Sequence, residues 1–246
     1  MSASHRLPEK VQKTLESCVE RLKNSIGPGL ESVVLYGSAV RGGYQPGVSD
    51  INLLIVLEDS IPAIHAAIAD VLSSTKLQIE PFIVSRRGFE RSQKAFAIKF
   101  QSILRQHLVL HGTSPFVGIK IEPHWVKFLS EQALRNLRLR TTRAFVVFGR
   151  DRRRYSHFLG EVYAGIFVDL SEPLRCETIE VPDEFADRIV VFEKVFGLDA
   201  SVLNELIAFH DAPHRLSRDE ILSFHSRLFA ILDQVIIWME NRWPNP

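Results

Sequence analysis

Two stretches, Val33-Val34-Leu35-Tyr36-Gly37-Ser38 and Ser49-Asp50-Ile51-Asn52-Leu53-Leu54-Ile55-Val56-Leu57, decide the fold of this chain. Each contains an apolar run whose length is typical of a buried strand. The first run ends at a glycine, where the backbone can turn sharply and lie close to a ligand. Ser38 then opens the next segment. We therefore expect its hydroxyl and the neighbouring amides to donate hydrogen bonds to a phosphate at a helix N-terminus.

The second stretch carries two oxygen-bearing side chains at its start. Asp50 and Asn52 are two residues apart on a predicted strand, so their side chains leave the same face of the sheet. That spacing suits two oxygen ligands of one hard cation. Ser49, directly before them, is a candidate nucleotide-binding residue.

A third candidate ligand, Glu80, lies in the predicted strand over residues 77–84. Its apolar neighbours Ile79 and Phe82 hold that strand in the sheet. A carboxylate among them is costly unless a cation or hydrogen bonds compensate. Glu80 is therefore predicted to face the same metal as Asp50, and the alternative is a glutamate at a strand end that faces solvent.

Taken together, these residues resemble the signature of the DNA-polymerase-β-like nucleotidyltransferase superfamily. In that signature a glycine-serine turn precedes two acids two residues apart, and a third acid follows on another strand. The nearest likeness is to the aminoglycoside (streptomycin-type) adenylyltransferases, and it covers roughly residues 30 to 115. The resemblance implies that Gly37 and Ser38 hold phosphates, that Asp50 and Glu80 are catalytic and bind Mg²⁺, and that Glu80 can serve as base. It also implies ATP as co-substrate and transfer of AMP to a hydroxyl of a small molecule.

Asn52 departs from that signature, because it stands where the family has its second acid. An amide offers one neutral oxygen, whereas magnesium favours anionic oxygens. If the missing charge costs about 3 to 4 kcal/mol in the transition state, the rate falls by roughly a hundred- to a thousandfold. The sequence thus also allows a catalytically silent relative that binds a nucleotide or a protein partner.

The wider pattern predicts an N-terminal α/β domain over residues 1–116 and a C-terminal all-α bundle over residues 117–246. The first has a helix before the strands, a small mixed sheet with flanking helices, and an edge strand over residues 108–112. The second is a series of long helical periods, and Ser217-Arg218-Asp219-Glu220 is a capping box before the last of them.

Composition and charge narrow the classes of protein to which the chain can belong. With a net charge of +1, the chain is not a globally basic nucleic-acid binder. Cys18 and Cys176 match no metal spacing and are expected to be reduced thiols. The polar N-terminus and the absence of a stretch approaching about 20 apolar residues lead us to expect a cytoplasmic protein.

A run of arginines in the helical part has several interpretations. The arginines are either surface side chains that pair with acids or donors that reach toward a triphosphate. A nucleic-acid surface is disfavoured because no aromatic residues are interleaved. Arg152 and His157 also fit the loose Arg-x4-His pattern of HEPN-type ribonuclease toxins, which leaves a toxin-antitoxin-like component as a further alternative. The run consists of Arg135, Arg138, Arg140, Arg143, Arg150, Arg152, Arg153 and Arg154.

Overall fold

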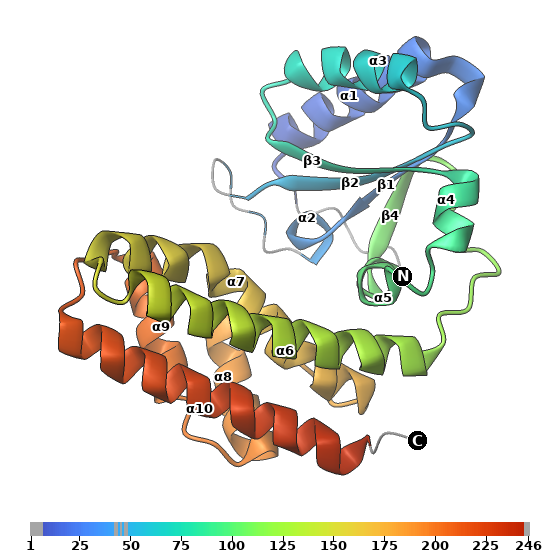
Figure 1. The fold of residues 1–246 in the computed structure, drawn as a ribbon. Helices are drawn as coiled ribbons and strands as arrows, with labels where there is room; N and C mark the ends of the chain where they lie inside the picture. Colours follow the sequence, from blue (N-terminus) through green and yellow to red (C-terminus); the bar gives the residue numbers. More distant parts are fainter. Residues whose placement is uncertain (1–6, 42–43, 45, 47–48, 244–246) are drawn as a thin grey trace. The chain divides into compact units, whose positions relative to one another are not determined.

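The structure is a computed structural model that describes residues 7–41, 44, 46 and 49–243 (Figure 1). The chain divides into two compact units, Met1–Glu122 and Pro123–Pro246. Each unit has its own hydrophobic core and is described by itself.

A four-stranded mixed sheet forms the centre of the first unit. Its strands are β1 (Leu30–Tyr36), β2 (Ile51–Leu57), β3 (Ile79–Ser85) and β4 (His107–Gly112), in the spatial order β3-β2-β1-β4. β1 is antiparallel to β2 and β4, whereas β2 and β3 are parallel. The mixed sheet and the edge strand expected from the sequence are thereby confirmed.

Helices cover both faces of this sheet (Figure 1). The longer helices α1 (Glu9–Ile26) and α3 (Pro62–Ser73) pack on one face, and α4 (Arg86–Arg91) and α5 (Ala97–Arg105) pack on the other. A strand buried on both faces needs apolar side chains at every position, which explains the unbroken apolar runs in β1 and β2. Two short elements, η1 (Gly27–Gly29) and α2 (Ser38–Arg41), flank β1.

Alternation along the strands assigns their side chains to these two layers. Val33 and Leu35 of β1 belong to the core under α1 and α3. Val34, Tyr36 and Leu54 belong to the other core, with the aromatic side chains of α4 and α5. Side chains at positions 34 and 36 of β1 and at the even positions of β2, including position 52, therefore point to the α4–α5 face.

The second unit is all helical, as expected. It consists of α6 (Pro123–Phe148), α7 (Arg152–Cys176), α8 (Phe185–Phe196), α9 (Ser201–Asp211) and α10 (Arg218–Arg242). The predicted capping box is present: Ser217 Oγ accepts a hydrogen bond from the Glu220 amide at 3.2 Å, and Glu220 Oε2 accepts one from the Ser217 amide at 2.6 Å.

Among the described residues, α10 is the one helix long and apolar enough, by length and composition alone, to cross a membrane. The sequence expectation that no stretch approaches such a span was therefore wrong by this test. In the structure, Leu228, Leu232 and Val235 of α10 are fully buried in the core of the helical unit. A core helix meets the same criteria as a membrane span.

Candidate active site

Strand pairing places four polar side chains in one row across the sheet. Tyr36 of β1 pairs with His107 of β4 on one side and with Asn52 of β2 on the other, and Asn52 pairs with Glu80 of β3. Paired residues of neighbouring strands point to the same face of a sheet. The row therefore lies on the α4–α5 face, and it brings Asn52 and Glu80 side by side.

Gly37 follows β1 directly and packs against this row. Its φ of +82° is a conformation that other residues rarely adopt. A Cβ built on Gly37 would lie 3.1 Å from Nδ2 of Asn52. Glycine is thus required both by the turn, which the sequence predicted, and by the approach of the backbone to Asn52, which it did not; the predicted approach to a phosphate stays a prediction.

Ser38 and Asp50 occupy the loop ends next to the row. Ser38 is the first residue of α2, a single helical turn. Asp50 immediately precedes β2, two residues before Asn52. Its Oδ1 atom is buried and has no hydrogen-bond partner among the described residues. Ser49, which comes before it, is partly buried.

A buried carboxylate oxygen without a partner is costly, and a cation is a ligand that would satisfy it. The oxygen donors that Asp50, Asn52 and Glu80 offer suit a hard cation such as Mg²⁺. Yet within residues 7–41, 44, 46 and 49–243, no three His, Cys, Asp or Glu side chains are grouped to hold a metal ion. A metal held by the two acids and the amide would take its remaining ligands from phosphate oxygens.

The row ends differently at its two sides. Glu80 is exposed, so its carboxylate is open to solvent and to ligands. His107 is engaged at both ring nitrogens: Nδ1 lies 3.0 Å from the Ile103 carbonyl oxygen and Nε2 lies 3.2 Å from Ser114 Oγ. His107 therefore has a structural role, and the chemical groups lie toward β2 and β3.

Lys99 is a residue of this face that the sequence analysis missed. It projects from α5, and its Nζ atom lies 4.8 Å from the centroid of the Tyr36 ring and 5.8 Å from that of Phe82. Tyr36 is the partner of Asn52 in the sheet, and Phe82 is two residues beyond Glu80 on the same face. An exposed ammonium thus stands over the polar row, where it could contact a phosphate.

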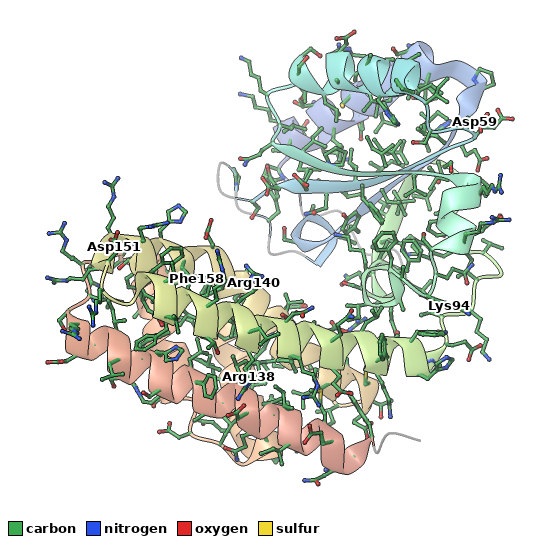
Figure 2. The ribbon with its side chains drawn as sticks, in the orientation of Figure 1. Asp59, Lys94, Arg138, Arg140, Asp151 and Phe158 are labelled. Carbon is green, nitrogen blue, oxygen red and sulfur yellow. The ribbon has the colours of Figure 1, made fainter. Side chains whose placement is uncertain are left out.

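In the helical unit, much of the arginine run makes local contacts. Arg135 bonds to both Glu131 and Glu240 at 2.7 Å, and the bond to Glu240, followed by that to Glu131, raises its pKa. Arg138, labelled in Figure 2, pairs with Asp233 of α10 and stacks on Phe229. These two arginines hold α6 to α10, which favours the structural interpretation for them.

Asp169 of α7 is a second group missed by the sequence analysis. It is partly buried, and burial raises the pKa of its carboxyl to about 6, against the attraction of Arg140 and with the repulsion of Glu172. In the sequence, Asp169 is one of several charged residues of a long predicted helix, and no motif or spacing distinguishes it from the others. The helical unit thus holds a carboxylate that gains or loses a proton near neutral pH.

The comparisons with known proteins agree with the fold described above. Residues 11–109 match the family model of the nucleotidyltransferase domain. Among solved structures, the chain is similar to the spectinomycin adenyltransferase AAD(9) from Enterococcus faecialis, determined with ATP and spectinomycin. The TM-score is 0.55 at 11% sequence identity, and the alignment covers 90% of this chain and 99% of that one. No curated protein sequence matches.

Proposed function

We propose that this protein, whose N-terminal unit carries a nucleotidyltransferase domain over residues 11–109, transfers a nucleoside monophosphate from a magnesium-bound nucleoside triphosphate to a hydroxyl of a small molecule. The observation that carries the proposal is the unpartnered, buried Oδ1 of Asp50 beside the row of Asn52 and Glu80. AMP from ATP is the preferred donor, because the solved structure similar to this chain contains ATP.

The residues of the sheet unit divide the binding task. The Gly37 turn lets backbone amides approach phosphate oxygens, and Ser38 adds a hydroxyl donor. Asp50, Asn52 and Glu80 would hold magnesium, which supplies charge neutralisation to the phosphates when bound. The ammonium of Lys99, on the same face, contributes a second positive charge.

In the proposed reaction, the oxygen of the acceptor hydroxyl attacks the α-phosphorus. A new P–O bond forms, the bond from the α-phosphorus to the bridging oxygen breaks, and pyrophosphate leaves with that oxygen. The hydroxyl proton passes to the Glu80 carboxylate, which is exposed and therefore accessible to an acceptor. The acceptor is proposed to be an aminoglycoside-like polyol, since the similar structure contains spectinomycin.

The first experiment measures nucleotide binding by thermal shift with ATP and magnesium. A ligand at a hundred times its Kd stabilises a fold by about 2.7 kcal/mol. Asp50→Asn should lose this stabilisation, because it replaces the carboxylate, whose buried oxygen has no partner among the described residues, by a neutral amide. Glu58→Gln is the matched control: it removes an exposed acid just beyond the other end of β2 and should respond like the parent. A parent that shows no shift up to millimolar ATP, GTP, CTP or UTP contradicts the proposal.

A second candidate function is nucleotide binding without turnover. It is favoured by Asn52 and by the lack of a three-acid group among the described residues. Radiolabelled ATP with spectinomycin, streptomycin and other hydroxyl acceptors distinguishes the two. Label transfer that Asp50→Asn abolishes supports the enzyme, whereas ATP-induced stabilisation with no transfer to any acceptor supports the silent binder.

A further inference from the structure

The helical unit contains a cavity of about 710 Å³ at the start of α7. Its walls come from the first turns of α7, the end of α9 and the loop that leads to α10. This volume lies in the range of pockets that enclose small-molecule ligands. The segments meet only in the folded chain, since about fifty residues separate the two sides of the cavity.

The charged groups of this cavity are mostly cationic. Arg152, Arg153 and Arg215 line it, and Glu161 is the one carboxylate among the lining residues. Arg152 is held in place, because its Nε donates to the Leu216 carbonyl at 2.5 Å. For Arg153 and Arg215 no hydrogen bond or ion pair is formed within the part of the chain that the structure describes. Their guanidinium groups are thus available to bind an anion.

Three histidines also line the cavity, and two are oriented by contacts at Nδ1. His210 Nδ1 lies 3.3 Å from Asp211 Oδ1, and His214 Nδ1 lies 3.3 Å from the Ala212 carbonyl oxygen. In the neutral tautomer whose Nδ1–H donates to these acceptors, Nε2 carries a lone pair. Such a nitrogen accepts a hydrogen bond from a hydroxyl. The third histidine, His157, is 3.6 Å from the Glu161 carboxylate through its Nδ1.

Apolar surface completes the wall. Phe209 and Pro213 line the cavity, and His210 stacks on Tyr163 with ring centroids 3.9 Å apart. Flat apolar and aromatic groups of this kind bind the carbon face of a sugar or a base. A pure anion would need only the arginines, so the wall favours a ligand with an organic body.

The adjoining cavity, of about 610 Å³, shows that this charge pattern is local. It shares Phe209 and His214 but is lined by three carboxylates, those of Glu205, Asp219 and Glu220. Two bonds of 2.5 and 2.6 Å tie Glu205 to Arg227. An anion is therefore expected on the Arg153 and Arg215 side.

From these observations we infer that the cavity at the start of α7 binds a small sugar phosphate, such as a nucleoside 5′-monophosphate. Its phosphate lies on Arg153 and Arg215, where fork-shaped donors match phosphate oxygens. Its sugar hydroxyls donate to the histidine Nε2 atoms. The cavity is lined by residues of the helical unit alone, and the proposed nucleotidyl transfer does not require it.

The test is isothermal titration calorimetry of the full chain with AMP, ribose 5-phosphate, adenosine and inorganic phosphate. Saturable binding is expected for AMP and ribose 5-phosphate, and binding at least tenfold weaker for adenosine and for phosphate. If ribose 5-phosphate binds as tightly as AMP, the cavity contacts only the sugar and the phosphate. If AMP binds tenfold more tightly than ribose 5-phosphate, the cavity also contacts the base.

Variants locate the binding. The double variant Arg153→Gln, Arg215→Gln should weaken AMP binding at least tenfold. The control Arg143→Gln should not, because Arg143 is exposed and lies outside the cavity lining. Asp50→Asn should leave this binding unchanged, even where it abolishes ATP-induced stabilisation. AMP binding that Asp50→Asn removes and the arginine pair keeps would overturn the inference. So would the absence of saturable binding of either sugar phosphate at millimolar concentration, and so would phosphate binding as tightly as AMP.

Discussion

Replacing Asn52 by aspartate tests the central feature of the candidate active site. The new carboxylate would lie on the same face as Glu80 and one strand away, about 4.8 Å between backbones. Two charges about 5 Å apart repel by about 3 kcal/mol at an effective dielectric constant of 20. Because Glu80 is exposed, solvent screens part of this, and a net loss of about 1 to 2 kcal/mol is expected without metal.

That loss should appear as a melting temperature lower by about 4 to 8 °C in chelator, given the size of the sheet unit. Added magnesium should reverse it, because a cation neutralises the three acids, and should stabilise the variant more than the parent. If the missing charge limits the chemical step by about 3 to 4 kcal/mol, nucleotidyl transfer should rise by roughly a hundred- to a thousandfold.

Melting curves in chelator and in magnesium, together with single-turnover transfer of radiolabel from ATP, measure both effects. Asn204→Asp is the matched control, since it adds the same charge at an exposed position of α9. It should change neither the magnesium response nor the transfer rate. Equal melting temperatures for parent and Asn52→Asp in chelator, with equal gains from magnesium, would refute the argument that position 52 faces a metal site.

Three further predictions concern other residues of the two units. Lys99→Met should weaken ATP binding about tenfold, or about 1.4 kcal/mol, because it removes the ammonium over the polar row. The control Lys94→Met, just before α5, should not weaken ATP binding. Thermal shift titrations with ATP measure both variants. Gly37→Ala should cost about 1 to 3 kcal/mol in urea unfolding, because its φ of +82° and the approach to Asn52 strain any larger residue. For Asp169, whose pKa is raised from 3.8 to about 6, the folded state binds more protons between these values, so stability falls as pH rises through that window. Asp169→Asn should therefore gain up to about 3 kcal/mol at pH 7.5 and almost nothing at pH 4, and equal gains at both pH values would contradict this assignment.

Local sequence patterns were enough to predict the sheet unit. The apolar runs of β1 and β2, one followed by Gly37 and the other preceded by Asp50, predicted both strands, because burial on two faces allows almost no other residue types. The period of two also placed Asp50 and Asn52 on one face. What the pattern left open was the partner of Glu80, since strand register is set by tertiary pairing.

Residues brought in from distant segments could not be found in this way. Lys99 reaches the polar row because α5 packs back onto the sheet. In the sequence of α5 it is one exposed lysine, and nothing in that sequence indicates which residues it contacts. The cavity in the helical unit brings Arg153, at the start of α7, next to Arg215, which follows α9, and the arginine run in the sequence does not include Arg215. The feature that distinguishes Asp169 is the raised pKa of its carboxyl, which burial causes. The helical spacing of apolar residues does not indicate the burial of a single acid.

The contact between Gly37 and Asn52 separates binding from catalysis in the proposed function. Asparagine and aspartate have nearly the same shape, so either residue at position 52 requires the glycine and the same turn. Phosphate contacts made by backbone amides and by Ser38 depend on that turn and are independent of the charge at position 52. Stabilisation of the transition state, in contrast, depends on the charge that holds metal ions. The Asn52→Asp variant should therefore change the rate of transfer far more than the Kd for ATP, and a change confined to the Kd would show that the amide limits binding.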